Sequence, residues 1–145
     1  DRLPERLMLF YTGIKRVSSH ILEDQKNGID NNRRFIDEMV RLTDKFLHGI
    51  QQNSIDNVGE LLHEGWMLKK RLARNISNGL MDRYYDMAIK AGASGGKLVG
   101  AGAGGFLLFY CEKDQQEMVR NALSDLREIP FGFESQGSKI IYVSG

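Results

Sequence analysis

The middle of the chain carries two long stretches in which apolar residues recur every three or four positions. This spacing predicts two amphipathic helices, one from Asn31 to about Gln52 and one that begins after Ser54 as its N-cap. The first stripe consists of Ile36, Met39, Val40, Thr43, Phe46, Leu47 and Ile50. The second stripe consists of Val58, Leu61, Leu62, Gly65, Leu68, Leu72 and Ile76. A further helix is predicted over 80–90, and a shorter one after Ser18 or Ser19 that ends at Gly28.

Short apolar runs at both ends of the chain predict strands. The runs are "RLMLFYTG" (6–13), "KLVGA" (97–101), "FLLFYC" (106–111), "IPFGFE" (129–134) and "KIIYV" (139–143). Ile129, Phe131 and Phe133 alternate as in a half-buried strand, and "DQQE" at 114–117 is a capping box with Asp114 as N-cap of a helix. Without the inserted helices the order is βαββαβ, which predicts one α+β, ferredoxin-like domain over 1–145.

Composition excludes several classes of protein. The formal net charge is +1 and the basic clusters are short, so no nucleic-acid partner is expected. The one cysteine, Cys111, excludes an internal disulfide and ends an apolar run, which favours a small buried side chain. His20, His48 and His63 lie on separate segments without metal-ligand spacing, so no metal site is expected. No apolar run approaches ~18 residues and no signal peptide is visible, so we expect a cytoplasmic protein without a membrane span.

The stretch "KLVGAGAGGFLLFY" (97–110) contains G-x-G-x-x-G at Gly100, Gly102 and Gly105. A dinucleotide fingerprint needs a helix after the glycines, but a predicted strand follows them, and no G-K-S or G-K-T is present for a Walker loop. The pattern therefore predicts a glycine turn between two strands. Its small residues, Gly100, Ala101, Gly102, Ala103 and Gly104, suit the close approach of a ligand or of another backbone. Ligand contact and packing against a second domain both remain open.

Four other residues are candidates for a binding site. Thr12, Gly13 and Arg16 end the first predicted strand, where Arg16 could bind phosphate oxygens or pair with an acid such as Glu23. Lys69 falls on the edge of an apolar stripe, so its ammonium either reaches solvent or points into a cleft that suits a sugar phosphate. Trp66 on the same predicted helix suits the core or a sugar platform, and Lys97 is explained by the C-terminus of a preceding helix.

Four segments together resemble one family. "GASGGKLVGAGAGGFLLFY" resembles the third signature motif of the GHMP kinases, and "LFYTG" followed by Arg16 resembles the strand that opens their C-terminal domain. "LLHEGWMLKKRLARNIS" resembles the long helix of the sugar-phosphate branch, and "FGFESQGSKIIYV" resembles its closing hairpin. The heptose 7-phosphate kinases are the most similar branch, and the fucose-type kinases share much of the pattern.

This resemblance implies a ferredoxin-like fold and transfer of the γ-phosphoryl group of ATP to the anomeric hydroxyl of heptose 7-phosphate, for nucleotide-heptose and lipopolysaccharide precursor synthesis. The family's ATP loop, which opens with proline, and its catalytic aspartate lie in an N-terminal domain. Pro4 and Pro130 lead no such loop, so the chain looks like a C-terminal half. ATP and Mg²⁺ would be bound mainly by an N-terminal domain of the same chain, and this half alone would be inactive. A homodimer and a free-standing regulatory domain that binds a small ligand remain alternatives.

Overall fold

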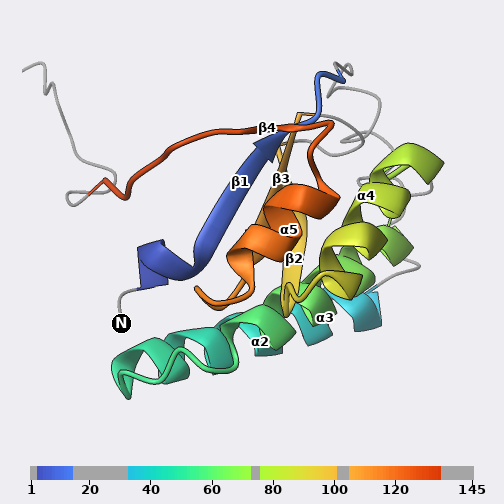
Figure 1. Ribbon diagram of the computed structural model, residues 1–145. Helices are drawn as coiled ribbons and strands as arrows, with labels where there is room; N and C mark the ends of the chain where they lie inside the picture. Colours follow the sequence, from blue (N-terminus) through green and yellow to red (C-terminus); the bar gives the residue numbers. More distant parts are fainter. Residues whose placement is uncertain (1–2, 15–32, 73–75, 101–104, 135–145) are drawn as a thin grey trace, which may run out of the picture.

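The computed structural model of the chain describes residues 3–14, 33–72, 76–100 and 105–134. A short 3-10 turn, η1 (Leu3–Arg6), leads into a four-stranded sheet of β1 (Leu7–Tyr11), β2 (Gly95–Val99), β3 (Phe106–Tyr110) and β4 (Arg127–Glu128). The strand order is β2-β3-β1-β4 and each neighbouring pair is antiparallel (Figure 1). This order is that of the ferredoxin-like arrangement, so the α+β prediction is confirmed.

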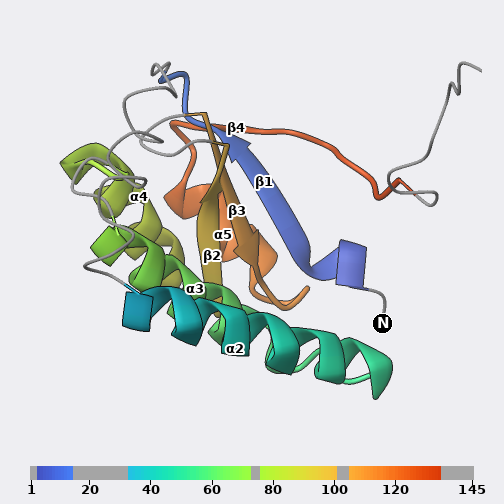
Figure 2. The same cartoon turned by 180° about the vertical axis from the view of Figure 1, so that it is seen from behind.

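One face of the sheet is covered by two helices, α4 (Gly79–Lys90) and α5 (Gln116–Ala122). Met8 and Phe10 alternate with half-buried neighbours along β1 and enter a buried cluster with Phe109 of β3. Tyr85 of α4 and Val119 of α5 belong to the same cluster. Helix α5 lies in front of the strands in Figure 1 and behind them in Figure 2. The hydrophobic core therefore lies between the sheet and these helices.

Two further helices, α2 (Arg33–Gln51) and α3 (Val58–Leu72), lie on the other side of β2. Helix α3 contacts β2 directly and α2 packs on α3, as Figure 2 shows from behind. The contact is so close that a Cβ atom added to Gly95 would lie 1.8 Å from the carbonyl oxygen of Gly59. Helix α3 thus covers the edge strand β2. The hydroxyl of Tyr85, on α4, joins the two: it donates to the Gly96 carbonyl of β2 at 3.4 Å and lies 2.7 Å from Nδ1 of His63 on α3.

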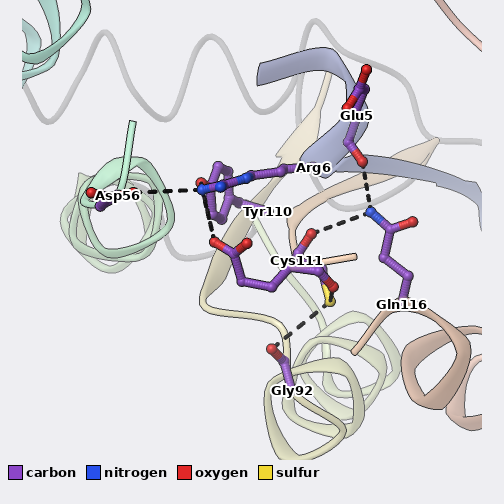
Figure 3. A network of polar contacts seen from close by, with 8 residues as sticks. Glu5, Arg6, Asp56, Gly92, Tyr110, Cys111 and Gln116 are labelled. Atoms are coloured by element: carbon purple, nitrogen blue, oxygen red, sulfur yellow. Dashed lines mark hydrogen bonds and ion pairs between the residues drawn. The ribbon is translucent and has the colours of Figure 1, made fainter. Parts of the chain in front are cut away.

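A network of polar contacts joins segments that are far apart in the sequence (Figure 3). The guanidinium of Arg6 donates to the hydroxyl of Tyr110 at 2.8 Å and to the carboxylate of Glu112 at 2.9 Å. The carboxylate of Asp56, in the segment before α3, lies 3.6 Å from the same nitrogen. Arg6 therefore ties the start of β1, the end of β3 and the approach to α3 together.

The structure confirms several predicted elements. The helices expected over 31–52 and 80–90 are α2 and α4, with ends within two residues of the prediction. Cys111 is buried, as expected, and this burial raises the pKa of its thiol to about 11.

Among the described residues no helix is long and apolar enough to cross a membrane. The helix expected over 18–28 and the strand expected over 139–143 lie outside the described residues.

The structure corrects two predicted helix starts. Ser54 caps no helix: its backbone N–H donates to the carbonyl of Gly49 at 2.9 Å, and α3 begins four residues later at Val58. The capping box is also wrong, because α5 begins at Gln116, after a turn in which the N–H of Gln115 donates to Glu112. Asp114 lies exposed ahead of this helix.

The strand expected over 129–134 is also wrong. The last described strand, β4, consists of Arg127 and Glu128, and only the N–H of Ile129 still reaches the β1 backbone, at the carbonyl of Leu9. Phe131 and Phe133 lie beyond it, 39% and 60% exposed, with their rings in a T-shaped contact. Alternation alone did not place these residues in the sheet.

Candidate functional site

The glycine turn connects β2 and β3, as the sequence predicted. Gly100 and Gly105 stand at its two ends with φ angles of +105° and +86°, which favour glycine because other residues rarely adopt them. Among the residues that the structure describes, none places an atom within 4 Å of where a Cβ atom of Gly100 would stand. A strand rather than a helix follows the turn, so the G-x-G-x-x-G pattern is not a dinucleotide fingerprint. Ala101, Gly102, Ala103 and Gly104 lie outside the described residues.

The end of β1 is fastened to this turn. The backbone N–H and the hydroxyl of Thr12 both donate to the carbonyl of Gly105, at 2.9 and 2.8 Å. The N–H of Gly105 in turn donates to the carbonyl of Ile14 at 2.8 Å, across Gly13, whose φ is +72°. The structure therefore brings Thr12 and Gly13 to the glycine turn, where the hydroxyl of Thr12 holds the turn in place. Arg16, the remaining candidate from this segment, lies outside the described residues.

Lys69 lies at a different place, in a groove between α2 and α3. The groove has a volume of about 300 Å³ and is lined mostly by apolar side chains of the two helices. Two lysines, Lys69 and Lys97, are the charged residues in this lining. Lys69 is half-buried, and this burial, together with the charge of Lys97, lowers the pKa of its ammonium group. Lys69 therefore lines a cleft, and the direction of its ammonium into that cleft stays a prediction.

Sequence reasoning missed Lys97. The sequence pattern placed it at the start of a strand and explained its charge by the C-terminus of the preceding helix, whereas the structure places it in the middle of β2. Successive strand residues point to opposite faces, so Lys97 shares a face with Gly95, which contacts α3, and not with the buried Leu98. The alternation along "GGKLV" could have placed Lys97 opposite the core.

Trp66 belongs to the core. Its side chain is 2% exposed and its ring lies 6.5 Å from that of Tyr85. The indole Nε1 is buried without a hydrogen-bond partner among the described residues. A buried donor without an acceptor costs about 1–3 kcal/mol, so this N–H offsets part of the stability that the burial of Trp66 contributes.

No metal centre is visible in the described part of the chain, where no group of three or more histidine, cysteine or acidic side chains could hold an ion. The functional features of this part are therefore two: a glycine turn fastened to the end of β1, and a groove with two lysines beside β2. Both lie on a ferredoxin-like α+β domain with two helices added outside its edge strand.

Comparison with known proteins places this domain in a family. The chain belongs to the GHMP kinases, because the model of the family's C-terminal domain matches residues 46–128. It is 28% identical over 152 residues to the D-glycero-α-D-manno-heptose 7-phosphate kinase of Campylobacter jejuni, a match that covers 96% of this chain and 42% of that protein. It is also 28% identical over 133 residues to the bifunctional fucokinase/GDP-fucose pyrophosphorylase of Arabidopsis thaliana, covering 88% of this chain and 12% of that one.

Among solved structures, the mevalonate kinase of L. major in complex with R-mevalonate superimposes with a TM-score of 0.75. The match covers 84% of this chain and 40% of the kinase at 18% sequence identity, so it shows a shared fold. The chain thus spans less than half the length of each of these three relatives.

Proposed function

We propose that the chain is the C-terminal domain of an ATP-dependent sugar-phosphate kinase, which phosphorylates the anomeric hydroxyl of D-glycero-D-manno-heptose 7-phosphate. The observation that carries this proposal is the similarity to a heptose 7-phosphate kinase along 96% of the chain. The glycine turn supports it, because a turn of small residues allows a ligand to approach the backbone.

Phosphoryl transfer depends mostly on positioning and on neutralising the charge of the phosphate oxygens. In the proposed enzyme an N-terminal domain of the same chain binds ATP and Mg²⁺, which supply the phosphoryl group and the counter-charge. The glycine turn of the present domain faces that active site. Gly100 fits this role, since no described residue has an atom within 4 Å of the place where its side chain would stand. The hydrogen bonds from Thr12 to Gly105 hold one end of the turn and so limit how far it can move away from the substrate.

The experiment that tests the proposal measures ADP release by the complete natural gene product with heptose 7-phosphate, mannose 6-phosphate, fucose, galactose and mevalonate. The isolated chain is assayed in parallel. We expect turnover with heptose 7-phosphate by the gene product and none by the isolated chain. Turnover with fucose instead would move the substrate to the fucose-type branch. No turnover with any substrate, together with a thermal shift of the isolated chain by a small ligand, would favour a regulatory binding domain.

A second test addresses the glycine turn. Gly102→Val places a branched side chain in the middle of the turn, where we expect the substrate to approach the backbone. We expect a loss of turnover or of substrate affinity in the gene product. Wild-type turnover and affinity in this variant would remove the turn from the mechanism.

A further inference from the structure

We propose that Lys69 and Lys97 bind the phosphate group of the sugar substrate that does not react, in the groove between α2 and α3. This inference rests on the proposed function, because it names the part of the chain that recognises the phosphorylated end of the sugar. It concerns a place separate from the glycine turn, and it assigns a ligand to two side chains of different elements, α3 and β2.

The charges in the groove carry the inference. Lys69 and Lys97 both line it, and among the described residues neither forms an ion pair or a hydrogen bond with an acidic side chain. The neighbouring Lys70 differs, since its ammonium lies 3.0 Å from the carboxylate of Asp82. Two like charges beside apolar walls repel each other and are partly removed from water, which is unfavourable without a counter-ion. Burial and the charge of Lys97 are also the two causes of the lowered pKa of Lys69. A bound dianion would compensate both the loss of water and the repulsion between the lysines.

The surroundings fit a phosphate that is attached to a carbon skeleton better than a free anion. The groove is lined by apolar side chains such as Leu42, Phe46 and Leu62, and its volume of about 300 Å³ is near the lower end for small-molecule sites. The lysines can therefore hold the phosphate while the apolar walls cover the adjoining carbon atoms.

The position along β2 favours the sugar phosphate over the nucleotide. Lys97 and Gly100 are three residues apart on the strand and its turn, which corresponds to about 10 Å at the rise of an extended chain. The reacting phosphates of ATP must lie beside the acceptor hydroxyl, at the glycine turn in the proposed enzyme. A second anion site one sugar length away matches the far end of a phosphorylated sugar, whose anomeric hydroxyl then reaches the turn.

The test uses the complete gene product with the variants Lys69→Met and Lys97→Met. Methionine keeps an unbranched apolar chain of similar length and removes only the charge. Lys90→Met, at the exposed last turn of α4, is the control because it makes the same charge change outside the groove. Isothermal titration without nucleotide measures the binding of heptose 7-phosphate and of inorganic phosphate, and steady-state assays measure KM for the sugar phosphate and for ATP.

We expect both groove variants to bind heptose 7-phosphate and inorganic phosphate at least about tenfold more weakly, because each loses a hydrogen bond to a charged group. KM for the sugar phosphate should rise to the same extent, with kcat and KM for ATP within twofold of the wild type. Lys69→Arg and Lys97→Arg, which keep the charge, should recover part of the affinity. Unchanged phosphate binding in both methionine variants would overturn the inference, and so would a rise in KM for ATP alone.

The failure of the proposed function has a different result. If the gene product releases no ADP with any sugar phosphate, the kinase proposal fails, but the titrations with inorganic phosphate still decide whether the two lysines form an anion site. If it releases ADP and both methionine variants keep the wild-type KM for the sugar phosphate, the kinase proposal stands and the assignment of the lysines is refuted.

Discussion

The contact between α3 and β2 makes Gly95 a position where one added methyl group should lower the stability of the fold strongly. In Gly95→Ala the new Cβ atom would lie 1.8 Å from the carbonyl oxygen and 2.7 Å from the carbonyl carbon of Gly59. Real Cβ atoms essentially never approach closer than 3.0 Å, so α3 would have to move by roughly 1.2 Å relative to β2. Both atoms belong to the backbone, so no side-chain rotation can relieve the overlap.

The expected cost follows from this rigidity. Extra methyl groups in packed cores usually cost about 1–3 kcal/mol, and a contact with backbone belongs at the upper end of that range. Alanine also restricts the unfolded chain, which returns about 0.4–1 kcal/mol. The net loss should be about 2 kcal/mol. With a urea dependence of about 2 kcal/mol per molar for a small protein, the unfolding midpoint should fall by about 1 M.

Urea unfolding followed by the fluorescence of the buried Trp66 measures this change, since the tryptophan lies on the helix that must move. Gly79→Ala is the matched control: Gly79 opens α4, and a Cβ atom there would meet no atom of the described residues within 4 Å. We expect this variant to keep or slightly raise the midpoint, because alanine favours the helix. Equal midpoints for Gly95→Ala and the wild type would refute the close packing of α3 on β2.

Three further predictions concern single side chains. Lys69→Met should stabilise the protein at pH 7, because the lowered pKa of Lys69 beside Lys97 means that its charged form disfavours folding. Above the lowered pKa, the unfolded wild type holds a proton on Lys69 that the folded state has lost, so wild-type stability rises with pH there. The advantage of the methionine variant in urea midpoint should therefore be smaller at pH 10 than at pH 7. Tyr85→Phe should lower the free energy of unfolding by about 1 kcal/mol, since the hydroxyl loses its contacts with His63 and Gly96; an unchanged value would contradict these contacts. Cys111 should resist alkylation at pH 8 in the folded protein and react fully in urea, because it is buried and its thiol pKa is raised to about 11; rapid labelling of the native protein would contradict this.

The sequence predicted the elements whose signal is local. The helical spacing over 31–52 and the apolar runs of β1, β2 and β3 depend on neighbouring residues only, and they were found. The helix starts that depend on tertiary contacts were not predicted correctly. Helix α3 begins at Val58, beside the contact of Gly59 with Ser94 and Gly95, and not at the nearest capping residue, Ser54.

The apolar stripe of α2 shows another limit of sequence patterns. The stripe correctly predicted the helix, but Val40 and Leu47 are 57% and 54% exposed. Periodicity reports that one side of a helix is apolar and does not report what covers that side. In the same way, the alternation at Phe131 and Phe133 described a strand that found no partner in the sheet.

Part of the candidate site could be predicted. The glycine turn followed from the apolar runs on either side of it, whereas its link to Thr12 and Gly13 did not, because that link depends on the pairing of β1 with β3. Lys69 was recognisable as a charge at the edge of an apolar stripe. Its neighbour Lys97 was not, because the two lysines meet only after β2 packs against α3, and that contact depends on a pair of glycines without side chains to predict it.

The place of β1 in the sheet has a consequence for how the chain is made. This strand comes first in the sequence, yet both of its neighbours come much later, and Leu7 pairs with Tyr110, more than 100 residues further on. At synthesis rates of 5–20 residues per second, Met8 and Phe10 wait roughly 5–20 s before the strand that buries them leaves the ribosome. The β2–β3 hairpin forms by local contacts, whereas insertion of β1 closes the longest loop and should be slow. Among the described strands, β1 is thus the one whose apolar side chains stay exposed longest during synthesis.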